Sequence, residues 1–213
     1  MIVPNMNTKE LLIEVFNDLE VVDRKAAYLA QGMRREAVKS KAKYVHRVFN
    51  YKSKKNNCWL IIVDYYVKEP CYTVVVYYNN QYGLNGILVD GRNQALIHFT
   101  PHFLERYNSR FLNENGASNL ELLKRFIPNN SLQVIKAVQK IDIDKNRIFG
   151  RFKEGVGLGY EEVFHDKGKV FHHYKTFISN DMIRDNQIED FNILGKHYDT
   201  YWEEVYGRGK RRA

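Results

Sequence analysis

The sequence predicts an α+β fold with one or more antiparallel sheets, an N-terminal helical segment, central helices and a C-terminal helix. The first observation behind this prediction is the order of apolar patterns along the chain, which runs helix, strands, helices, strands, helix. The second is an aromatic content of 14%, mostly Tyr and Phe, which suits sheet packing or a stacking surface. The third is that 213 residues contain only 4 Pro and 13 Gly, which leaves little room for linkers.

The N-terminal helix is predicted from a cap and an apolar stripe. Asn7 followed by Glu10 resembles a capping box, so the helix should begin near Thr8. Apolar residues then recur at helical spacing as far as Val38, with Gly32 as a possible break. We therefore expect one long helix or two, ending before Tyr44.

An antiparallel meander is predicted next. Its strands are short runs rich in β-branched and aromatic residues, separated by Lys, Asn and Pro turns. These runs cover 44–51, 58–67, 71–79, 86–89 and 95–99. Cys58 and Cys71, the only cysteines, fall on two joined strands and would lie about 30 Å apart along the ladder, far outside disulfide reach. Two free thiols, with no leader-like N-terminus and no long apolar run, predict a cytoplasmic protein without a membrane partner.

The second half repeats the order of helices followed by strands. Thr100 and Pro101 form an N-cap signal for a helix that should end near Asn113. Two further helices are expected at 118–126 and 132–139, strands at 147–152, 156–165 and 169–179, and a final amphipathic helix at 187–206 before a basic tail. We divide the chain into 1–94 and 95–213, either as two domains or as parts of one.

The charge distribution predicts a partner that carries phosphate. The net charge is +8, and residues 24–55 hold eleven Lys or Arg against Glu36 alone. RNA or another nucleic acid is the expected partner of such a segment, which also carries aromatic residues that could stack on bases. The candidate binding residues are Arg34, Arg35, Lys39, Lys41, Lys43 and Arg47. The alternatives are a solvated helix face and a surface that meets an acidic protein.

The densest group of chemically active residues is the predicted helix that follows Pro101. His102, Arg106 and Arg110 are spaced i, i+4, i+8 and would share one helix face. The positive end of the helix dipole favours a neutral His102, which can accept a proton beside two anion-binding guanidinium groups. The alternative is a helix cap followed by a solvated surface.

The pattern over residues 95–179 resembles the core of the barnase, EndoU, colicin and RelE (BECR) superfamily of toxin-like ribonucleases. The resemblance is carried by a strand ending in Phe99-Thr100, the His-x-x-x-Arg-x-x-x-Arg helix, a second helix and a last strand containing Thr176. It implies an active-site cleft lined by His102, Arg106, Arg110 and Thr176, with Tyr174 and His172 on the alternating face of Thr176. About 90 additional N-terminal residues and a C-terminal helix set this chain apart from the small toxins.

Two other site types are not favoured. Gly155-x-Gly157-x-Gly159 precedes a predicted strand instead of a helix, so it lacks the backbone donors of a nucleotide loop. The histidines show no paired ligand spacing on one helix, so no metal or other cofactor is expected.

Three functions follow from these observations. The first is a metal-independent endoribonuclease, related to toxins or mobile elements, in which a 2′-hydroxyl attacks the adjacent phosphodiester and Thr176 and Tyr174 orient the phosphate. The second is a non-catalytic nucleic-acid-binding protein on the same scaffold. The third is a protein-interaction module with an acidic partner.

Overall fold

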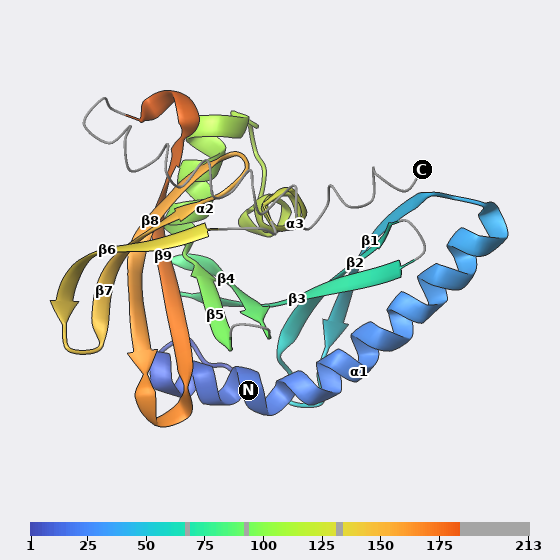
Figure 1. Ribbon diagram of the computed structural model, residues 1–213, viewed down its shortest axis with the longest axis horizontal. Helices are drawn as coiled ribbons and strands as arrows, with labels where there is room; N and C mark the ends of the chain where they lie inside the picture. The colour runs from blue at the N-terminus through green and yellow to red at the C-terminus, as the bar shows by residue number, and fades with distance from the viewer. Residues whose placement is uncertain (67–68, 92–93, 131–133, 184–213) are drawn as a thin grey trace. The chain divides into compact units, whose positions relative to one another are not determined.

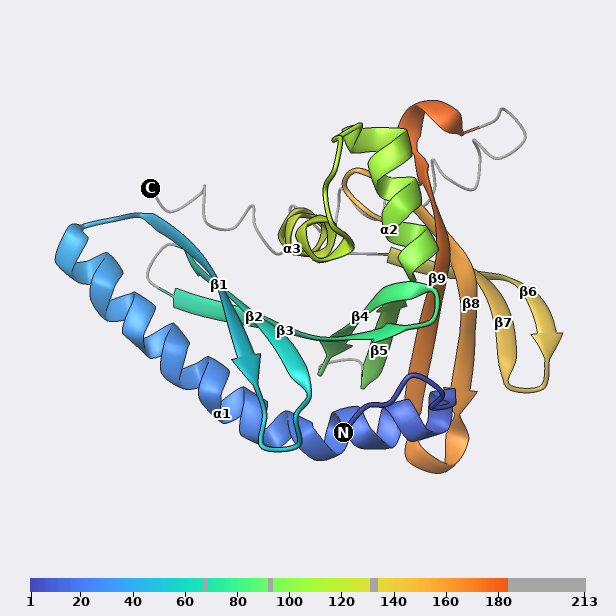
Figure 2. The ribbon, with the colours of Figure 1, turned by 180° about the vertical axis from the view of Figure 1, so that it is seen from behind.

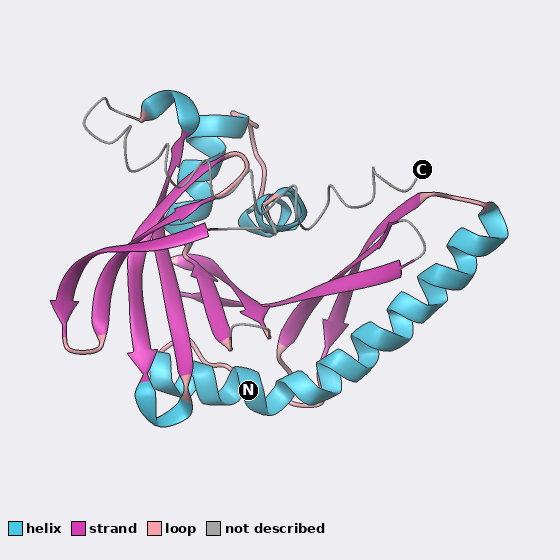
Figure 3. Cartoon of the chain, viewed as in Figure 1, coloured by secondary structure: helices cyan, strands magenta, loops and turns pink. Residues whose placement is uncertain are grey.

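The computed structural model describes residues 1–66, 69–91, 94–130 and 134–183. The chain forms two compact units, Met1–His98 and Phe99–Ala213, which we describe separately. Helices and antiparallel strand pairs occur in both units, so the α+β class is confirmed (Figures 1 and 3). The helix expected at 187–206 and the basic tail lie outside the described residues.

The first unit begins with one long helix, α1 (Thr8–Ser40, 33 residues). Its capping box is present, because the Asn7 side chain accepts a hydrogen bond from the Glu10 N–H and the Glu10 carboxylate accepts one from the Asn7 N–H. The helix continues through Gly32 and ends at Lys41, which adopts the left-handed conformation with φ 56°. Of the two expectations, one long helix is therefore the one observed.

The predicted meander is confirmed in the first unit. Its strands are β1 (Tyr44–Lys52), β2 (Cys58–Tyr66), β3 (Glu69–Asn80), β4 (Gly83–Asp90) and β5 (Ala95–Phe99), adjacent in that order. The pairs β1–β2, β2–β3 and β3–β4 are antiparallel. Helix α1 packs along β2 and β3 (Figure 2). Cys58 lies opposite Tyr77, six residues from Cys71, and neither cysteine forms a disulfide within the described residues.

A buried carboxylate fixes α1 on this sheet. Asp18 is only 2% exposed and accepts hydrogen bonds from Asn57 Nδ2 and Trp59 Nε1, both at 2.9 Å. Each of these buried donors therefore has a partner, as buried polar groups require. Trp59 belongs to β2, and Asn57 is the residue immediately before this strand. The two hydrogen bonds therefore hold α1 in one position along β2.

The second unit starts with α2 (Pro101–Tyr107), capped by the Thr100 side chain, which accepts from the Phe103 N–H. A π-helical turn follows at Asn108–Leu112, and then α3 (Asn119–Asn129), capped by Ser118. The remaining strands are β6 (Val134–Asp142), β7 (Lys145–Arg151), β8 (Gly155–Phe164) and β9 (Lys169–Ser179), with the order β9-β8-β7-β6. The pairs β6–β7, β7–β8 and β8–β9 are antiparallel.

The helix predicted at 132–139 is wrong, because residues 134–142 form β6. Two register shifts, between Ala137 and Gln139 and between Lys140 and Asp142, interrupt the alternation of its side chains. A strand with such irregularities loses the period-two pattern by which it could be told from a helix.

An aromatic core holds the second unit together. Its seven rings are Phe99, Phe103, Tyr107, Phe126, Phe152, Tyr174 and Phe177, all almost completely buried, with centroids of neighbouring rings as close as 4.9 Å. Glycines in β7 and β8 make room for them. A Cβ on Gly157 would lie 2.6 Å from Tyr174 Cδ1, and one on Gly155 would lie 2.3 Å from Phe177 Cζ. This close packing explains Gly155 and Gly157 without any nucleotide.

Tyr107 also joins α2 to the turn between β7 and β8. Its hydroxyl donates to Glu154 Oε2 at 2.7 Å, and Asn130 Nδ2 donates to the same oxygen at 2.6 Å. The Glu154 N–H donates in return to Asn130 Oδ1 at 3.0 Å. Burial and this hydrogen bond raise the pKa of Tyr107, which therefore stays a donor.

Among the helices that the structure describes, none has both the length and the apolar character needed to cross a bilayer.

Candidate nucleic-acid interface

The exposed face of α2 brings His102 and Arg106 together, as their spacing predicts. Arg106 Nε donates to His102 Nε2 at 3.3 Å, and the other ring nitrogen lies 3.8 Å from Glu105 Oε2. Because Nε2 accepts this hydrogen bond, it is the ring nitrogen that presents a lone pair in this arrangement. His102 and Glu105 are 55% and 60% exposed, so the pair lies on the surface and not in a closed pocket.

Arg110 is engaged differently from Arg106. It lies in the π-helical turn, where the advance of about 100° per residue on which the predicted shared face depends no longer holds. Its Nη1 donates to the main-chain carbonyl of Phe177 on β9 at 2.6 Å. One of its guanidinium donors therefore ties the turn to the strand.

The expectation that Tyr174 and His172 share a face with Thr176 is wrong. Thr176 lies opposite Leu158 and Tyr174 opposite Gly159, which leaves Lys175 as the extra residue of a β-bulge. Directly opposed residues project to the same side of a sheet and adjacent residues to opposite sides, so Thr176 and Tyr174 point to opposite faces.

Helix α2 covers the Tyr174 face. Phe103 contacts the rings of Tyr174 and Phe177, with centroid distances of 6.0 and 5.8 Å. Tyr174 is fully buried, and burial raises its pKa. It therefore belongs to the core beneath α2, whereas Thr176 lies on the side of β9 that α2 does not cover.

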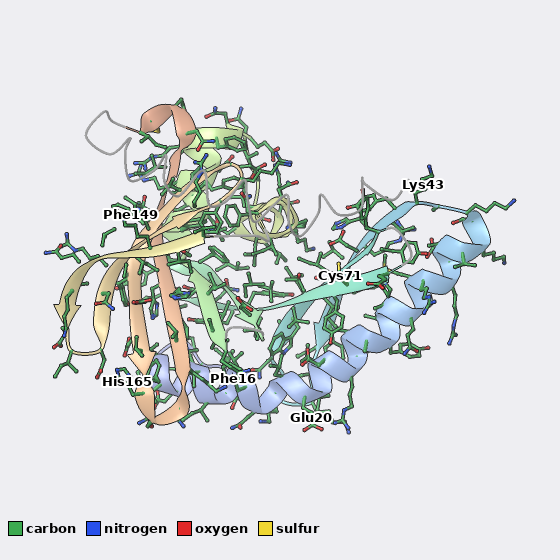
Figure 4. All side chains as sticks on the ribbon, in the orientation of Figure 1. Phe16, Glu20, Lys43, Cys71, Phe149 and His165 are labelled. Atoms are coloured by element: carbon green, nitrogen blue, oxygen red, sulfur yellow. The ribbon has the colours of Figure 1, made fainter. Side chains whose placement is uncertain are left out.

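The predicted basic residues gather at the end of α1 and the start of β1. We call Arg34, Arg35, Lys39, Lys41 and Lys43 the basic surface; all five side chains are exposed. None of them forms an ion pair with a carboxylate of the described residues. Figure 4 shows Lys43 at the connection between α1 and β1, with its side chain directed away from the strand. These five positive charges are therefore available to an external anion.

Arg47, the sixth predicted binding residue, is already paired. Its Nη2 lies 3.1 Å from Glu36 Oε1, and both side chains are about half exposed. Because Glu36 is the only acidic residue of the segment 24–55, this pair engages the one carboxylate that the segment itself supplies.

Beside the basic surface lies a polar cluster that sequence reasoning missed in part. His46 Nδ1 lies 2.8 Å from Asp64 Oδ1, and the Tyr44 hydroxyl donates to the same oxygen at 3.1 Å. Partial burial and the Asp64 carboxylate raise the pKa of Tyr44 to about 12, so it remains a donor at neutral pH. No pattern in the sequence marks Asp64, because its role depends on the register of β1 against β2.

Sequence reasoning also missed Tyr28. It is 68% exposed on α1 and lines a surface hollow that also includes Gly32, Arg35 and Phe49. A signal was available, because Tyr28 lies off the stripe of buried residues formed by Ala26, Ala30 and Met33. An aromatic residue on the polar side of a helix is a candidate contact residue.

A search of the described residues finds no group of three or more His, Cys, Asp or Glu side chains placed to hold a metal ion. Comparison with family models, curated proteins and solved structures finds no match to this chain. The resemblance to the BECR ribonucleases therefore stays a prediction.

Proposed function

We propose that this protein binds nucleic acid through the basic surface. The observation that carries the proposal is that five exposed cations lie within ten residues of chain, where α1 ends and β1 begins, without acidic partners among the described residues. Such a group neutralises phosphates and releases their counterions, which supplies most of the affinity of non-specific binding.

The competing explanation is that these charges only stabilise α1. The N-terminal half of the helix carries most of its acidic residues and the C-terminal half most of its basic ones, which the helix dipole favours. That effect falls off within the last turn, so it accounts for Lys39 but not for Arg34, Arg35 or Lys43. The helix dipole therefore explains only part of the charge.

The experiment is a titration of a fluorescein-labelled, mixed-sequence RNA followed by anisotropy at about 50 mM salt. The test variant carries Lys39→Gln, Lys41→Asn and Lys43→Gln; Asn is chosen at position 41 because it tolerates the left-handed conformation. We expect a loss of affinity of ten-fold or more. Binding of acidic proteins with no binding of RNA or DNA would replace this proposal by the protein-interaction alternative.

A matched control removes the same number of charges elsewhere in the first unit. Lys52→Gln, Lys54→Gln and Lys55→Gln lie at the end of β1 and the turn after it, at the far end of the strand from Lys43. The control should bind RNA nearly as well as the wild type. Equal losses in the two triple variants would mean that only net charge matters.

A second candidate function is a metal-independent endoribonuclease centred on α2. The observation that favours it is the contact between Arg106 Nε and His102 Nε2, which places an imidazole beside a guanidinium group. Two of the five predicted catalytic residues do not join this group. Tyr174 is buried beneath α2, and Thr176 lies on the side of β9 that α2 does not cover. We therefore rank it second.

Its test uses a mixed RNA pool. His102→Ala and Arg106→Ala should each abolish cleavage, the products should end in 2′,3′-cyclic phosphates, and a 2′-deoxy substrate should survive. A chelator should have no effect. Wild-type protein that binds RNA and leaves it intact would exclude this second function.

A cytoplasmic location, inferred from the free thiols, stays a prediction.

A further inference from the structure

A surface hollow beside Tyr28 has a composition that packing alone does not require. It lies between α1 and β1 and is lined by Tyr28, Gly32, Met33, Arg35, Glu36 and Phe49, among others. Its walls thus combine an exposed aromatic ring, apolar side chains, a cation and a carboxylate. Ligand-binding hollows commonly have this combination of apolar surface and a few polar groups.

Tyr28 presents a ring at the rim of the hollow. The residue is 68% exposed, although its neighbours on the buried stripe, Ala26 and Ala30, are 0% and 4% exposed. Lys25 Nζ lies 5.2 Å from the centre of the ring, so a positive charge already accompanies its π system. Lys25 precedes Tyr28 by one helical turn and Gly32 follows it by one turn, which places the three on one stripe.

Gly32 leaves space where any other residue would fill it. A Cβ built at this position would meet nothing within 4 Å, so no neighbouring element requires a glycine there. The backbone does not require one either, because Gly32 is not among the residues with positive φ. A glycine inside a helix is unfavourable for folding. Its effect at this position is to open the surface between Tyr28 and Arg35.

We propose that the hollow binds an unpaired nucleobase of a single-stranded nucleic acid, with the base stacked on Tyr28. This inference rests on the proposed function and makes it more specific, because it names single strands as the ligand. The base would lie over Gly32, and the Arg35 guanidinium would bind the adjoining phosphate.

The charges around the hollow suit this ligand. Arg35 belongs to both the hollow and the basic surface, so a strand whose phosphates follow the basic surface passes the hollow. Glu36 Oε1 is held by Arg47, and a carboxylate at that position can accept from an exocyclic amino group of a base. A paired base inside a duplex could not enter, because its faces are covered by its neighbours in the stack.

The experiment compares one labelled 12-nucleotide RNA as a single strand and annealed to its complement. Tyr28→Ala should weaken binding of the single strand about ten-fold and change duplex binding less than two-fold. Tyr28→Phe keeps the ring and should retain the wild-type affinity. The control is Tyr82→Ala, which removes a tyrosine of similar exposure, 75%, from the turn after β3.

A second variant fills the hollow. Gly32→Met should raise the melting temperature, because it replaces a helix-interior glycine by a good helix former, and should weaken single-strand binding about ten-fold. A variant that is more stable but binds less well cannot be explained by unfolding. Gly91→Met, at another glycine with open space around it, should leave binding unchanged.

The outcomes separate this inference from the proposed function. If the wild type binds the RNA and the Lys39, Lys41, Lys43 variant does not, while Tyr28→Ala and Gly32→Met bind normally, the nucleobase site is excluded and the basic surface stands. Equal losses for single strand and duplex in Tyr28→Ala would also overturn the site. If the wild type binds neither RNA, both proposals fail.

Discussion

The two units place their tyrosines differently. In Phe99–Ala213, Tyr107 and Tyr174 are completely buried, and Tyr160, the remaining tyrosine of the described part of this unit, is half-buried. In Met1–His98, five tyrosines are exposed by 39% or more: Tyr28, Tyr44, Tyr66, Tyr72 and Tyr82. The described tyrosines are thus mostly core residues in the second unit, whereas five of the nine tyrosines in the first unit are exposed.

This difference shows which aromatic residues are available to a ligand. Rings that fill a core contribute packing, and pairs of them add about 0.5–1.5 kcal/mol each beyond the area that they bury. They cannot also contact a substrate, which is why Tyr174 is excluded from a binding site. Exposed rings do not take part in core packing, and those beside cations can stack on a base whose phosphate the cation binds. They are therefore the stronger candidates for recognition.

The largest expected effect comes from filling the core of the second unit. In Gly157→Ala the new Cβ would lie 2.6 Å from Tyr174 Cδ1 and 2.8 Å from Phe152 Cε2, and both rings are almost completely buried in the aromatic core. We expect a loss of about 3 kcal/mol in the free energy of unfolding, measured by urea denaturation. Gly91→Ala, where nothing lies within 4 Å, is the control. Similar stability of the two variants would show that the aromatic core is loosely packed.

The first unit should depend on a buried charge instead. Asp18→Ala leaves Asn57 Nδ2 and Trp59 Nε1 without their acceptor, so we expect a loss of about 2 kcal/mol in urea denaturation. Glu20→Ala, which removes a carboxylate that is 83% exposed on the same helix, should have little effect. Equal effects would mean that Asp18 does not fix α1 on the sheet.

Two hydroxyls within the aromatic core provide a finer test. Tyr107→Phe removes the 2.7 Å hydrogen bond to Glu154 and should cost about 1.5 kcal/mol. Tyr174→Phe removes a buried hydroxyl that has no hydrogen-bond partner among the described residues, so the free energy of unfolding should stay the same or rise. Thermal and urea denaturation of both variants measure the difference. A larger loss in Tyr174→Phe would restore a role for that hydroxyl.

The smallest effect concerns the cap of α3. Backbone and side-chain hydrogen bonds from Ser118 lower the pKa of Glu121 below its usual value of 4.5. A carboxyl whose folded pKa is lowered contributes stability above its unfolded pKa and loses it as the pH falls through the folded pKa. The urea midpoint should therefore fall less steeply below pH 4.5 in Glu121→Gln than in the wild type. Parallel profiles would show that this cap contributes nothing.

Local signals predicted much of this fold. The Asn7–Glu10 capping box and the Thr100–Pro101 cap mark the first residues of α1 and α2, and β5 and β9 have the bounds that their residue types predict. These features depend on neighbours in the chain, which the sequence displays directly.

The errors arise where one residue is inserted into a regular pattern. The bulge at Lys175 places Thr176 and Tyr174 on opposite faces of β9. The π-helical turn changes the direction of Arg110, and register shifts interrupt the alternating pattern of β6. An inserted residue changes the direction in which the side chains after it point, yet no fixed sequence pattern marks the insertion. The candidate catalytic group was therefore predicted less well than the basic surface, which requires only that charged side chains remain exposed.

The most direct test of the central claim, that the basic surface binds phosphate, is the salt dependence of single-stranded RNA affinity. The logarithm of the association constant should fall linearly with the logarithm of the salt concentration, by about 0.7 for each phosphate neutralised. The Lys39, Lys41, Lys43 variant should lower this slope by about 2, and the Lys52, Lys54, Lys55 control should leave it close to the wild-type value. Equal slopes in the two variants, or a wild type that binds no RNA, would contradict the account.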